Sequence, residues 1–440
     1  MATGLEKQIW IFLGLLGVGL YCLFLNYPNQ VIFDEVHFGK FVTAYCCTGE
    51  RFFDIHPPHA KLLIAGGAKI LGYTGGFDFD HIGESYGDIS PWKLRAVPAL
   101  AGALLPLVIF GILRAVGVSL SFSIVGALAI ALNNALIVQS RLIGLDSMLL
   151  LFEFSAVLAS IRGMKKLPQI EWKWWVVAGA LSGLALGVKF TGLAAIAIVM
   201  CIVVITLAEE LRQHSVSSIL FSRYTKIVAT VLASAFIVYV GGWFLHFQLL
   251  TNPGSGDAWG IPTGNFVTDV IKEHKTMLGA NYNLTATHPY ESKWWQWPVM
   301  TRSVFYWTGP NGEWIYFLGN PIIWIGSSLI FLTALFSAAL SGLRHWPRIA
   351  WIFLAGYLIA YIPLMRVPRA LFLYHYLTPL LFAILLGVWW LDATLSGETK
   401  KKAAVGLGIL FVLGFVAMAP VTYGFNGWQE QVIGLVSSWR

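Results

Sequence analysis

The sequence has 440 residues, of which 57% are hydrophobic, 15% aromatic and 12% charged. Soluble domains carry roughly 25% charged residues, so this composition, with a mean hydropathy of +0.70, excludes an ordinary soluble protein and indicates an integral membrane protein. The net charge of +7 does not imply nucleic acid as a partner, because basic residues of membrane proteins concentrate in cytoplasmic loops. Cys46 and Cys47 are adjacent and are not expected to pair with each other.

Eleven apolar runs approach the roughly 20 residues that span a bilayer. They predict an all-α membrane protein with spans at 8–25, 92–115, 118–138, 143–161, 174–188, 190–208, 225–246, 321–342, 349–365, 371–391 and 403–422. Two long stretches, 26–91 and 247–320, are too polar to cross. The short apolar run 61–72 predicts an interfacial or re-entrant helix. Three parts follow: a transmembrane catalytic module (1–246, including loop 26–91), a loop (247–320) and C-terminal transmembrane helices (321–440).

Lys and Arg are distributed unequally between the two sides of the predicted bundle. With the N-terminus inside, the inner short loops hold basic runs within 162–173 and 400–402. Under the positive-inside rule, this distribution places both long loops on the extracytoplasmic side. The outer short loops hold only four cations, which lie at span ends: Arg141, Lys189, Arg366 and Arg369.

These four cations have two interpretations. Lys and Arg near span ends often extend to lipid headgroups, but charges at an outward-facing cavity are also functional candidates. A polyprenyl-phosphate sugar carries its phosphate at this depth, and the arginine fork suits phosphate oxygens. Arg366 and Arg369, joined through Val367-Pro368, are therefore favoured for such a phosphate.

The first long loop begins with an acidic pair in FDEVHFGK, residues 33–40. Transfer of a sugar from a phosphate needs one base for the acceptor hydroxyl, because the phosphate leaves as an anion, whereas glycoside hydrolysis uses two carboxyl groups. Asp34 is the candidate base. Its alternative role is the N-cap of a helix that begins near Val36. Glu35 either hydrogen-bonds the surroundings of Asp34 or faces water.

A second polar cluster follows in DIHPPHAK, residues 54–61. Asp54, His56 and His59 are a candidate metal set, but a third ligand is not well placed, and zinc sites usually have three or four ligands. The two prolines between the histidines bar a helix there. The favoured interpretation is a rigid loop across the mouth of the site.

Seven motifs, in chain order, resemble those of the dolichyl- or polyprenyl-phosphate-mannose protein mannosyltransferases. They are FDEVHFGKF (33–41), YCCTGERFFDIHPPHAK (45–61), LRAVPALAG (94–102), QSRLIGLDSMLLLF (139–152), GLALGVKFTGL (183–193), THPYESKWWQWPVM (287–300) and FLYHYLTPLL (372–381). Each motif alone is weak, but their shared order along most of the chain makes chance agreement implausible.

The resemblance implies an inverting membrane glycosyltransferase of the C class, which moves mannose from the lipid phosphate to Ser or Thr hydroxyls of proteins on the outer face. Asp34 falls on the family's catalytic position, with Glu35 beside it, and Arg95 and Arg141 fall on motif arginines. These arginines join Lys189, Arg366 and Arg369 as the predicted donor-phosphate site. The residues predicted to lie in substrate-site loops are Asp54, His56, Asp146, His288, Lys293 and His375.

The sequence also departs from the family pattern. Loop 247–320 is too short for the soluble β-trefoil module of the fungal and animal members, which favours a prokaryotic member in the plasma membrane, with its site on the extracytoplasmic side. In a eukaryote the location would be the endoplasmic reticulum. The expected partners are the lipid-linked donor, a Ser/Thr-containing protein, membrane lipid and a second copy in a dimer, without nucleic acid. No obligatory cofactor is expected, and a divalent metal is left open.

Two other functions remain as alternatives. A related polyprenyl-phosphate-sugar transferase acting on a lipid or envelope glycan would use the same base and donor site, but HPYESKWWQWP (288–298) resembles the protein mannosyltransferases specifically. A transporter of polyprenyl-linked sugars often shows internal repeats and mid-membrane charges. Neither feature is evident in this sequence, so protein mannosyl transfer is the favoured function.

Overall fold

The computed structural model describes residues 4–213, 218–284, 287–342 and 346–439. Within them, nine helical segments are long and apolar enough to cross a membrane. The helices that form these segments are α1 (Gly4–Cys22), α4 (Trp92–Ala115), α7 (Asp146–Met164), α9 (Leu193–Gln213), α10 (Ser218–Leu249), α12 (Pro321–Ser341), α13 (Arg348–Tyr361), α14 (Leu377–Thr394) and α15 (Gly397–Tyr423).

Two of the eleven predicted spans differ from simple crossings. The run 118–138 forms a bent pair, α5 (Leu120–Ala131) and α6 (Asn134–Ser140), with an angle of 52° between them. The run 174–188 forms α8 (Trp172–Val188), which has 17 residues and is shorter than the other segments. All eleven runs are thus helical, while length and composition support nine crossings among the described residues, or ten with the bent pair.

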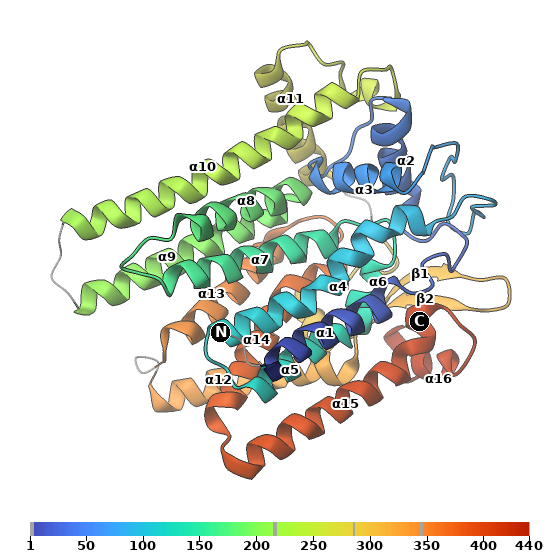
Figure 1. Ribbon diagram of the computed structural model, residues 1–440. Coiled ribbons are helices and arrows are strands. Elements are labelled where there is room, and N and C mark those ends of the chain that lie inside the picture. Colours follow the sequence, from blue (N-terminus) through green and yellow to red (C-terminus); the bar gives the residue numbers. More distant parts are fainter. Residues whose placement is uncertain (1–3, 214–217, 285–286, 343–345, 440) are drawn as a thin grey trace.

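Small residues allow close helix packing, as is common between membrane helices. On α8, a side chain at Gly179 would lie 2.3 Å from the carbonyl oxygen of Val231, and one at Gly183 would lie 2.4 Å from that of Ala235, both on α10. The buried centre is formed by α4, α5, α6, α7 and α14. Figure 1 shows these helices running side by side through the bundle.

Both long loops gather at one end of the bundle (Figure 1). The first contains α2 (Glu35–Thr43), a π-helix (Ala44–Thr48) and α3 (His59–Ile70), which is the predicted short helix. The second contains α11 (Phe266–Asn283) and an antiparallel hairpin that was not predicted, β1 (Val304–Thr308) and β2 (Trp314–Phe317). The shorter elements of the described residues are α16 (Gln429–Gly434) and 3-10 turns at Phe190–Gly192, Ser255–Trp259, Trp294–Val299, Pro363–Arg366, Leu373–Tyr376 and Ser437–Trp439.

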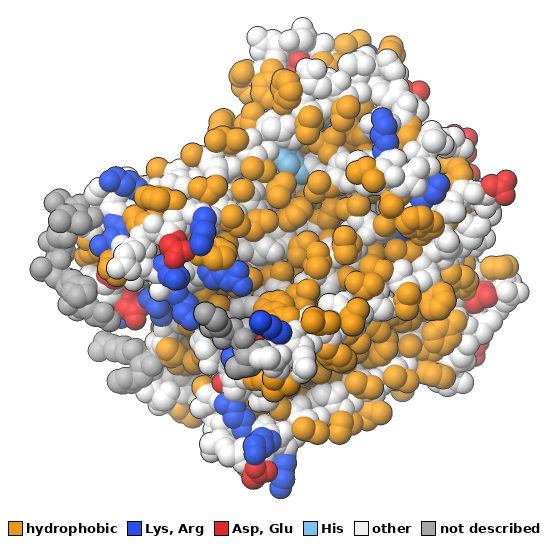
Figure 2. Space-filling model, viewed as in Figure 1, with side chains coloured by type: hydrophobic (Ala, Val, Ile, Leu, Met, Phe, Trp, Pro, Cys, Tyr) orange, Lys and Arg blue, Asp and Glu red, His pale blue; other side chains and the backbone are white. Residues whose placement is uncertain are grey.

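The two long loops are tied to each other. Arg51 of the first pairs with Asp257 of the second, with 2.6 Å between Nε and Oδ1. The prediction that Cys46 and Cys47 remain unpaired is wrong, because the structure joins them by a disulfide inside the π-helix. On the face shown in Figure 2, a broad hydrophobic band separates the Lys- and Arg-rich end of the bundle from the end with the long loops. The basic residues therefore gather at one end of the bundle, and the two long loops lie at the other.

Candidate functional site

The Asp34 carboxylate lies at the entrance to α2 and is half-buried. Asp34 occupies the N-cap position of α2, as the alternative interpretation predicted, but its side chain makes no capping hydrogen bond. Among the described residues, this side chain has no hydrogen-bond or ion-pair partner. Burial raises the pKa of Asp34 to about 7, against the opposing charge of Lys189, and Asp146 and Asp54 raise it further. A free carboxylate with a pKa near 7 is suited to accept a proton.

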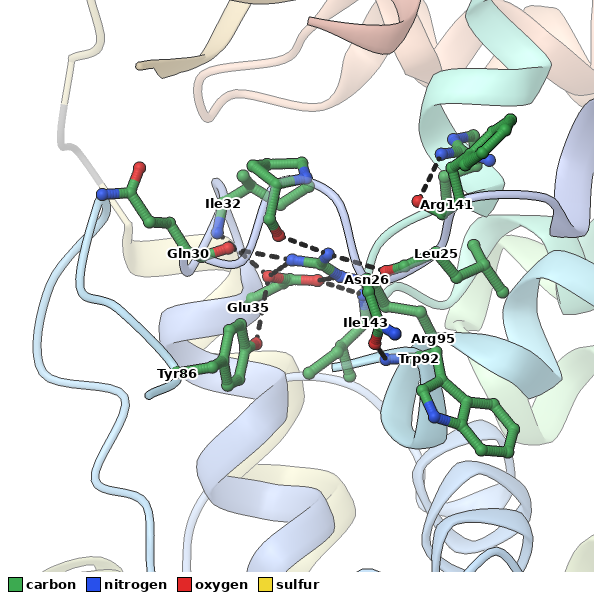
Figure 3. A network of polar contacts seen from close by, with 12 residues as sticks. Leu25, Asn26, Gln30, Ile32, Glu35, Tyr86, Trp92, Arg95, Arg141 and Ile143 are labelled. Atoms are coloured by element: carbon green, nitrogen blue, oxygen red, sulfur yellow. Dashed lines mark hydrogen bonds and ion pairs between the residues drawn. The ribbon is translucent and has the colours of Figure 1, made fainter. Parts of the chain in front are cut away.

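The neighbouring Glu35 is fully buried and has a different role. Its Oε1 accepts hydrogen bonds from Arg95 Nε at 2.7 Å and Ile143 N at 3.0 Å. Its Oε2 accepts from Arg95 Nη2 at 2.8 Å, Ile32 N at 3.0 Å and the Tyr86 hydroxyl at 3.2 Å. Figure 3 shows these donors converging on the one carboxylate. These contacts agree with the interpretation that Glu35 hydrogen-bonds the surroundings of Asp34, while its role as a catalytic carboxylate stays a prediction.

Arg95, predicted for the donor phosphate, is fully buried beside Glu35 (Figure 3). Besides its two bonds to Glu35, its Nη1 donates to the carbonyls of Leu25 and Pro28, at 3.1 and 2.8 Å. Its Nη2 donates to the carbonyl of Gln30 at 2.9 Å. A guanidinium has five N–H groups, and all five are used here. Arg95 therefore has no donor left for a phosphate, and it instead fixes the chain between α1 and Asp34.

Arg141 is also committed to the fold. Its Nη1 donates to the carbonyls of Leu23 and Tyr21, at 2.6 and 3.3 Å, and its Nη2 donates to that of Phe24 at 3.1 Å. These carbonyls lie at the C-terminal end of α1, where a cation is favourable because of the helix dipole. The guanidinium also lies 4.9 Å from the Tyr423 ring centre. Three of the five N–H groups of Arg141 are thus used by the fold, and its role at the donor phosphate stays a prediction.

Lys189 and Asp146, in contrast, do belong to the surroundings of Asp34. Their side chains form an ion pair with 2.6 Å between Nζ and Oδ1, and both charges act on the pKa of Asp34. The other oxygen of Asp146 accepts from Gln139 Nε2 at 2.6 Å, while Gln139 Oε1 accepts from the Tyr306 hydroxyl. Four residues from three parts of the chain are therefore linked beside the start of α7 and the end of α8.

Aromatic rings connect this network to Asp34. Phe33 stacks on Tyr306 with 4.0 Å between ring centres, and its N–H donates to the Tyr306 carbonyl at 3.2 Å. Phe33 also meets Tyr374 edge to face at 6.3 Å. The ring of Tyr374 lies 5.7 Å from Lys189 Nζ. The hairpin and the start of the Leu373–Tyr376 turn thus form one wall beside Asp34.

The charge of Asp54 contributes to the raised pKa of Asp34, so the predicted loop at 54–58 lies close to Asp34. Asp54 pairs with Lys61, which is almost fully buried and also donates to the His56 carbonyl at 2.7 Å. Burial, together with the surrounding cations Lys189, Lys61 and Arg369, holds the pKa of His56 well below its ordinary value. His56 is therefore neutral at pH 7, and the loop is fixed from within by Lys61.

The candidate metal set does not assemble in the structure. His59 lies in the first turn of α3 and its Nε2 is 3.0 Å from the carbonyl oxygen of Val238 on α10. Its ring packs against Gly187 and Gly242, where side chains would collide with it. With Asp54 held by Lys61, the described residues contain no group of three His, Cys, Asp or Glu side chains that could hold a metal ion.

Arg369 and Arg366 differ in their surroundings. The half-buried Arg369 has no hydrogen-bond or ion-pair partner among the residues described, and its charge acts on both His56 and His375. Burial lowers the pKa of Arg369, and the nearby Tyr374 opposes that shift. Arg366 is exposed, with no partner in the described part of the chain. Arg369 is thus the cation whose donors are available near His56 and Lys189.

The remaining predicted residues lie further out. His375 is half-buried in the Leu373–Tyr376 turn, where its Nδ1 is 3.1 Å from both N and O of Phe372. The exposed His288 meets Phe372 edge to face at 5.1 Å and so borders the same wall. Lys293 is exposed, and its nearest ion-pair partner is Glu291 at 3.9 Å. No contact of Lys293 with the other predicted site residues is found among the described residues.

Four residues of the site were missed as individuals by sequence reasoning: Lys61, Gln139, Tyr306 and Tyr374. Three of them lie inside the quoted motifs, and Lys61 is an almost fully buried cation at 1% exposure. Its signal was a lysine at the start of an apolar run, which has no ordinary place in a buried helix unless it is paired. Tyr306 had no comparable signal, since it lies in the hairpin that was not predicted.

Comparison with known proteins gives consistent results along the chain. A family model described as dolichyl-phosphate-mannose-protein mannosyltransferase matches residues 11–251, and a model of the C-terminal four-helix transmembrane region of protein O-mannosyltransferase matches residues 266–439. Dolichyl-phosphate-mannose--protein mannosyltransferase 4 of Schizosaccharomyces pombe is 33% identical over 244 residues, covering 53% of this chain and 31% of the relative. Mannosyltransferase 1 of Saccharomyces cerevisiae is 34% identical over 244 residues, covering 54% and 30%. The match thus spans about a third of the length of either relative.

Solved structures show the same fold. A chain of the Saccharomyces cerevisiae protein O-mannosyltransferase Pmt1-Pmt2 complex bound to the sugar donor superposes with a TM-score of 0.92 at 21% identity, over 100% of this chain and 93% of that one. ArnT from Cupriavidus metallidurans bound to undecaprenyl phosphate gives 0.53 at 16% identity, over 99% and 77%. These likenesses confirm the predicted membrane glycosyltransferase fold. Because the first family model alone matches more than half of the sequence, the chain belongs to the dolichyl-phosphate-mannose-protein mannosyltransferase family.

Proposed function

We propose that this protein transfers mannose from a polyprenyl or dolichyl phosphate to Ser or Thr hydroxyls of proteins, with Asp34 as the base. The observation that carries the proposal is the contrast between the two adjacent acids in a member of this family. Glu35 accepts five hydrogen bonds, while Asp34 has none among the described residues. These contacts support a positioning role for Glu35, and they leave the carboxylate of Asp34 available to accept a proton.

The reaction requires few groups from the protein. The acceptor oxygen forms a bond to C1 of the mannose, the bond from C1 to the phosphate oxygen breaks, and the phosphate leaves with the electron pair. The hydroxyl proton passes to Asp34. A single displacement of this kind inverts the configuration at C1. A carboxylate whose pKa lies near 7 can take the proton during the reaction and release it to water afterwards.

Arg369 is the favoured group for the leaving phosphate, with Lys189 beside it. Arg369 has no other partner among the described residues, and an arginine fork matches phosphate oxygens. Lys189 is already paired with Asp146, so its positive charge is held in a fixed position. Arg95 and Arg141 act indirectly: their hydrogen bonds to backbone carbonyls fix the segment between α1 and Asp34.

The proposal includes the location and partners of the protein. The basic short loops support an extracytoplasmic site, and the short loop 247–320 supports a prokaryotic plasma membrane. The donor-bound Pmt1-Pmt2 complex supports a lipid-linked mannose donor and association into a dimer. The reaction as written uses no metal.

The test is Asp34→Asn, which keeps the shape of the side chain and removes the proton acceptor. Transfer from labelled polyprenyl phosphate mannose to a Ser/Thr-rich peptide, in reconstituted membranes, should fall by about 10²–10⁴-fold. The matched control is Asp88→Asn, an exposed acid of the same loop, which should transfer normally. Donor binding and thermal stability should be preserved in both variants. Near-normal transfer by Asp34→Asn would remove Asp34 from this role.

A further inference from the structure

Helix α11, in the second long loop, has an apolar face that no other part of the described chain covers. Val267, Ile271, Leu278 and Tyr282 are 63%, 50%, 54% and 75% exposed. Their spacings of four, seven and four residues place them on one stripe of a helix. The exposed Lys275 lies at the edge of this stripe. We call these four residues the outer stripe of α11.

A side of α11 that adjoins this stripe is packed on the bundle. His274 Nε2 lies 2.6 Å from the Tyr239 hydroxyl of α10, and its ring centre is 4.9 Å from that of Trp243. At the start of α11, Phe266 meets Phe244 and Phe247 at 6.3 and 6.1 Å. Figure 1 shows α11 beside the end of α10. The helix therefore packs against the flank of a spanning helix.

The depth of these contacts can be worked out along α10. This helix has 32 residues, so it is about 48 Å long at 1.5 Å per residue, whereas the hydrocarbon core is about 30 Å thick. Arg223 and Lys226, in its first turns, mark one boundary of the core. About 20 residues further, the core ends near His246. The contacts of α11 fall at residues 239–247 of α10, which is the level of the opposite boundary.

We propose that α11 is an interfacial helix whose outer stripe rests in the headgroup–acyl boundary of the leaflet on the Asp34 side. The neighbouring surface of α10 is apolar and continuous with it, since Phe244, Leu245 and Leu249 are 53%, 51% and 43% exposed. Interfacial helices carry lysines beside an apolar face and bury that face in the membrane surface. Lys275 would then reach the lipid phosphates.

The same helix holds the loop beside the site. Asn281 Nδ2 donates to the Ile55 carbonyl at 3.1 Å, and Met277 is buried beneath the helix. Glu273 lines a small cavity together with Asp54 and Lys61. A membrane surface that fixes α11 therefore also fixes the loop carrying Asp54 and His56.

Site-specific photocrosslinking tests this proposal without relying on enzyme activity. Benzoylphenylalanine is placed, one position at a time, at Leu278, Leu245 and Ile82, in the full-length protein reconstituted with an alkyne-tagged phospholipid. The three side chains have similar exposure, at 54%, 51% and 49%. Leu245, on a spanning helix, is the positive control, and Ile82, in the polar part of the first loop, is the negative control.

The expected result is lipid crosslinking at Leu278 within about twofold of that at Leu245, and at least tenfold above that at Ile82. The proposal is overturned if Leu245 captures lipid while Leu278 resembles Ile82. It is equally overturned if Leu278 captures a second copy of the chain instead of lipid. Because lipid capture is read directly, the result is independent of whether Asp34 is the base.

Discussion

The most informative perturbation is Glu35→Gln, because it separates a structural role of this acid from a catalytic one. Glutamine is nearly isosteric with glutamate, so the packing around residue 35 is kept. The substitution removes the negative charge that faces Arg95, whose side chain is fully buried. It also turns one acceptor oxygen into a donor NH₂ group.

The magnitude follows from the hydrogen bonds of the two carboxylate oxygens. Oε1 accepts two and Oε2 accepts three, so the amide loses at least two hydrogen bonds whichever way it is oriented. Hydrogen bonds to a charged group contribute about 1.5–3 kcal/mol each. Breaking a buried ion pair on one side costs about 3–5 kcal/mol. Two lost hydrogen bonds give about 3–6 kcal/mol, which overlaps the ion-pair range, so the free energy of unfolding should fall by about 3–5 kcal/mol.

Unfolding by sodium dodecyl sulfate, followed by circular dichroism in mixed micelles, measures this free energy. The matched control is Glu50→Gln, an exposed acid of the same loop, which should change stability by less than about 0.5 kcal/mol. If Glu35→Gln unfolds like the unmodified protein but is inactive, the positioning role is refuted and Glu35 becomes a catalytic residue. If it is destabilised as expected, any loss of transfer is explained by displacement of Asp34.

Two further predictions concern the charges around Asp34. Because burial raises the pKa of Asp34 to about 7 and the base must be deprotonated, kcat/KM should fall about tenfold per pH unit below that value. Lys189→Met removes the cation that lowers this pKa, so the acidic limb should move to higher pH; a profile that is flat from pH 5 to 8 would contradict the assignment. Arg369→Ala should raise the KM for the donor by about 10–100-fold, from the loss of roughly 1.5–3 kcal/mol of charged hydrogen bonding. The exposed Arg366→Ala is its matched control and should change KM by less than about threefold, whereas equal effects of the two variants would show that Arg369 has no special place.

Much of the fold could be predicted from the sequence because a bilayer imposes a strong local signal. Twenty apolar residues form a helix wherever they occur, since their backbone groups must be satisfied internally. The run predicted at 92–115 is a helix with those bounds, α4. The hairpin at 304–317 was missed because its aromatic strands lie in a polar loop, where their pairing depends on packing against Phe33 and other distant residues.

The candidate site was harder to predict than the spans, for a physical reason. In the sequence, a lysine or arginine at the end of a span looks the same whether its side chain binds a ligand, a lipid headgroup or a backbone carbonyl. Arg95 and Glu35 are 60 residues apart, and Arg141 meets carbonyls 117–120 residues away. Local patterns could name these cations as unusual, but only the tertiary structure shows which of them still have donors available.

The contacts of Glu35 also have a consequence for the order in which the protein is made. The residues around Asp34 receive their shape from Arg95 on α4 and from the Ile143 amide just before α7. Chains fold as they are synthesised, N-terminal parts first, so the loop after α1 leaves the ribosome well before either partner exists. A nascent chain shorter than 143 residues lacks one of the five donors. The hydrogen bonds around Glu35 are therefore completed only after the chain has been synthesised as far as the start of α7.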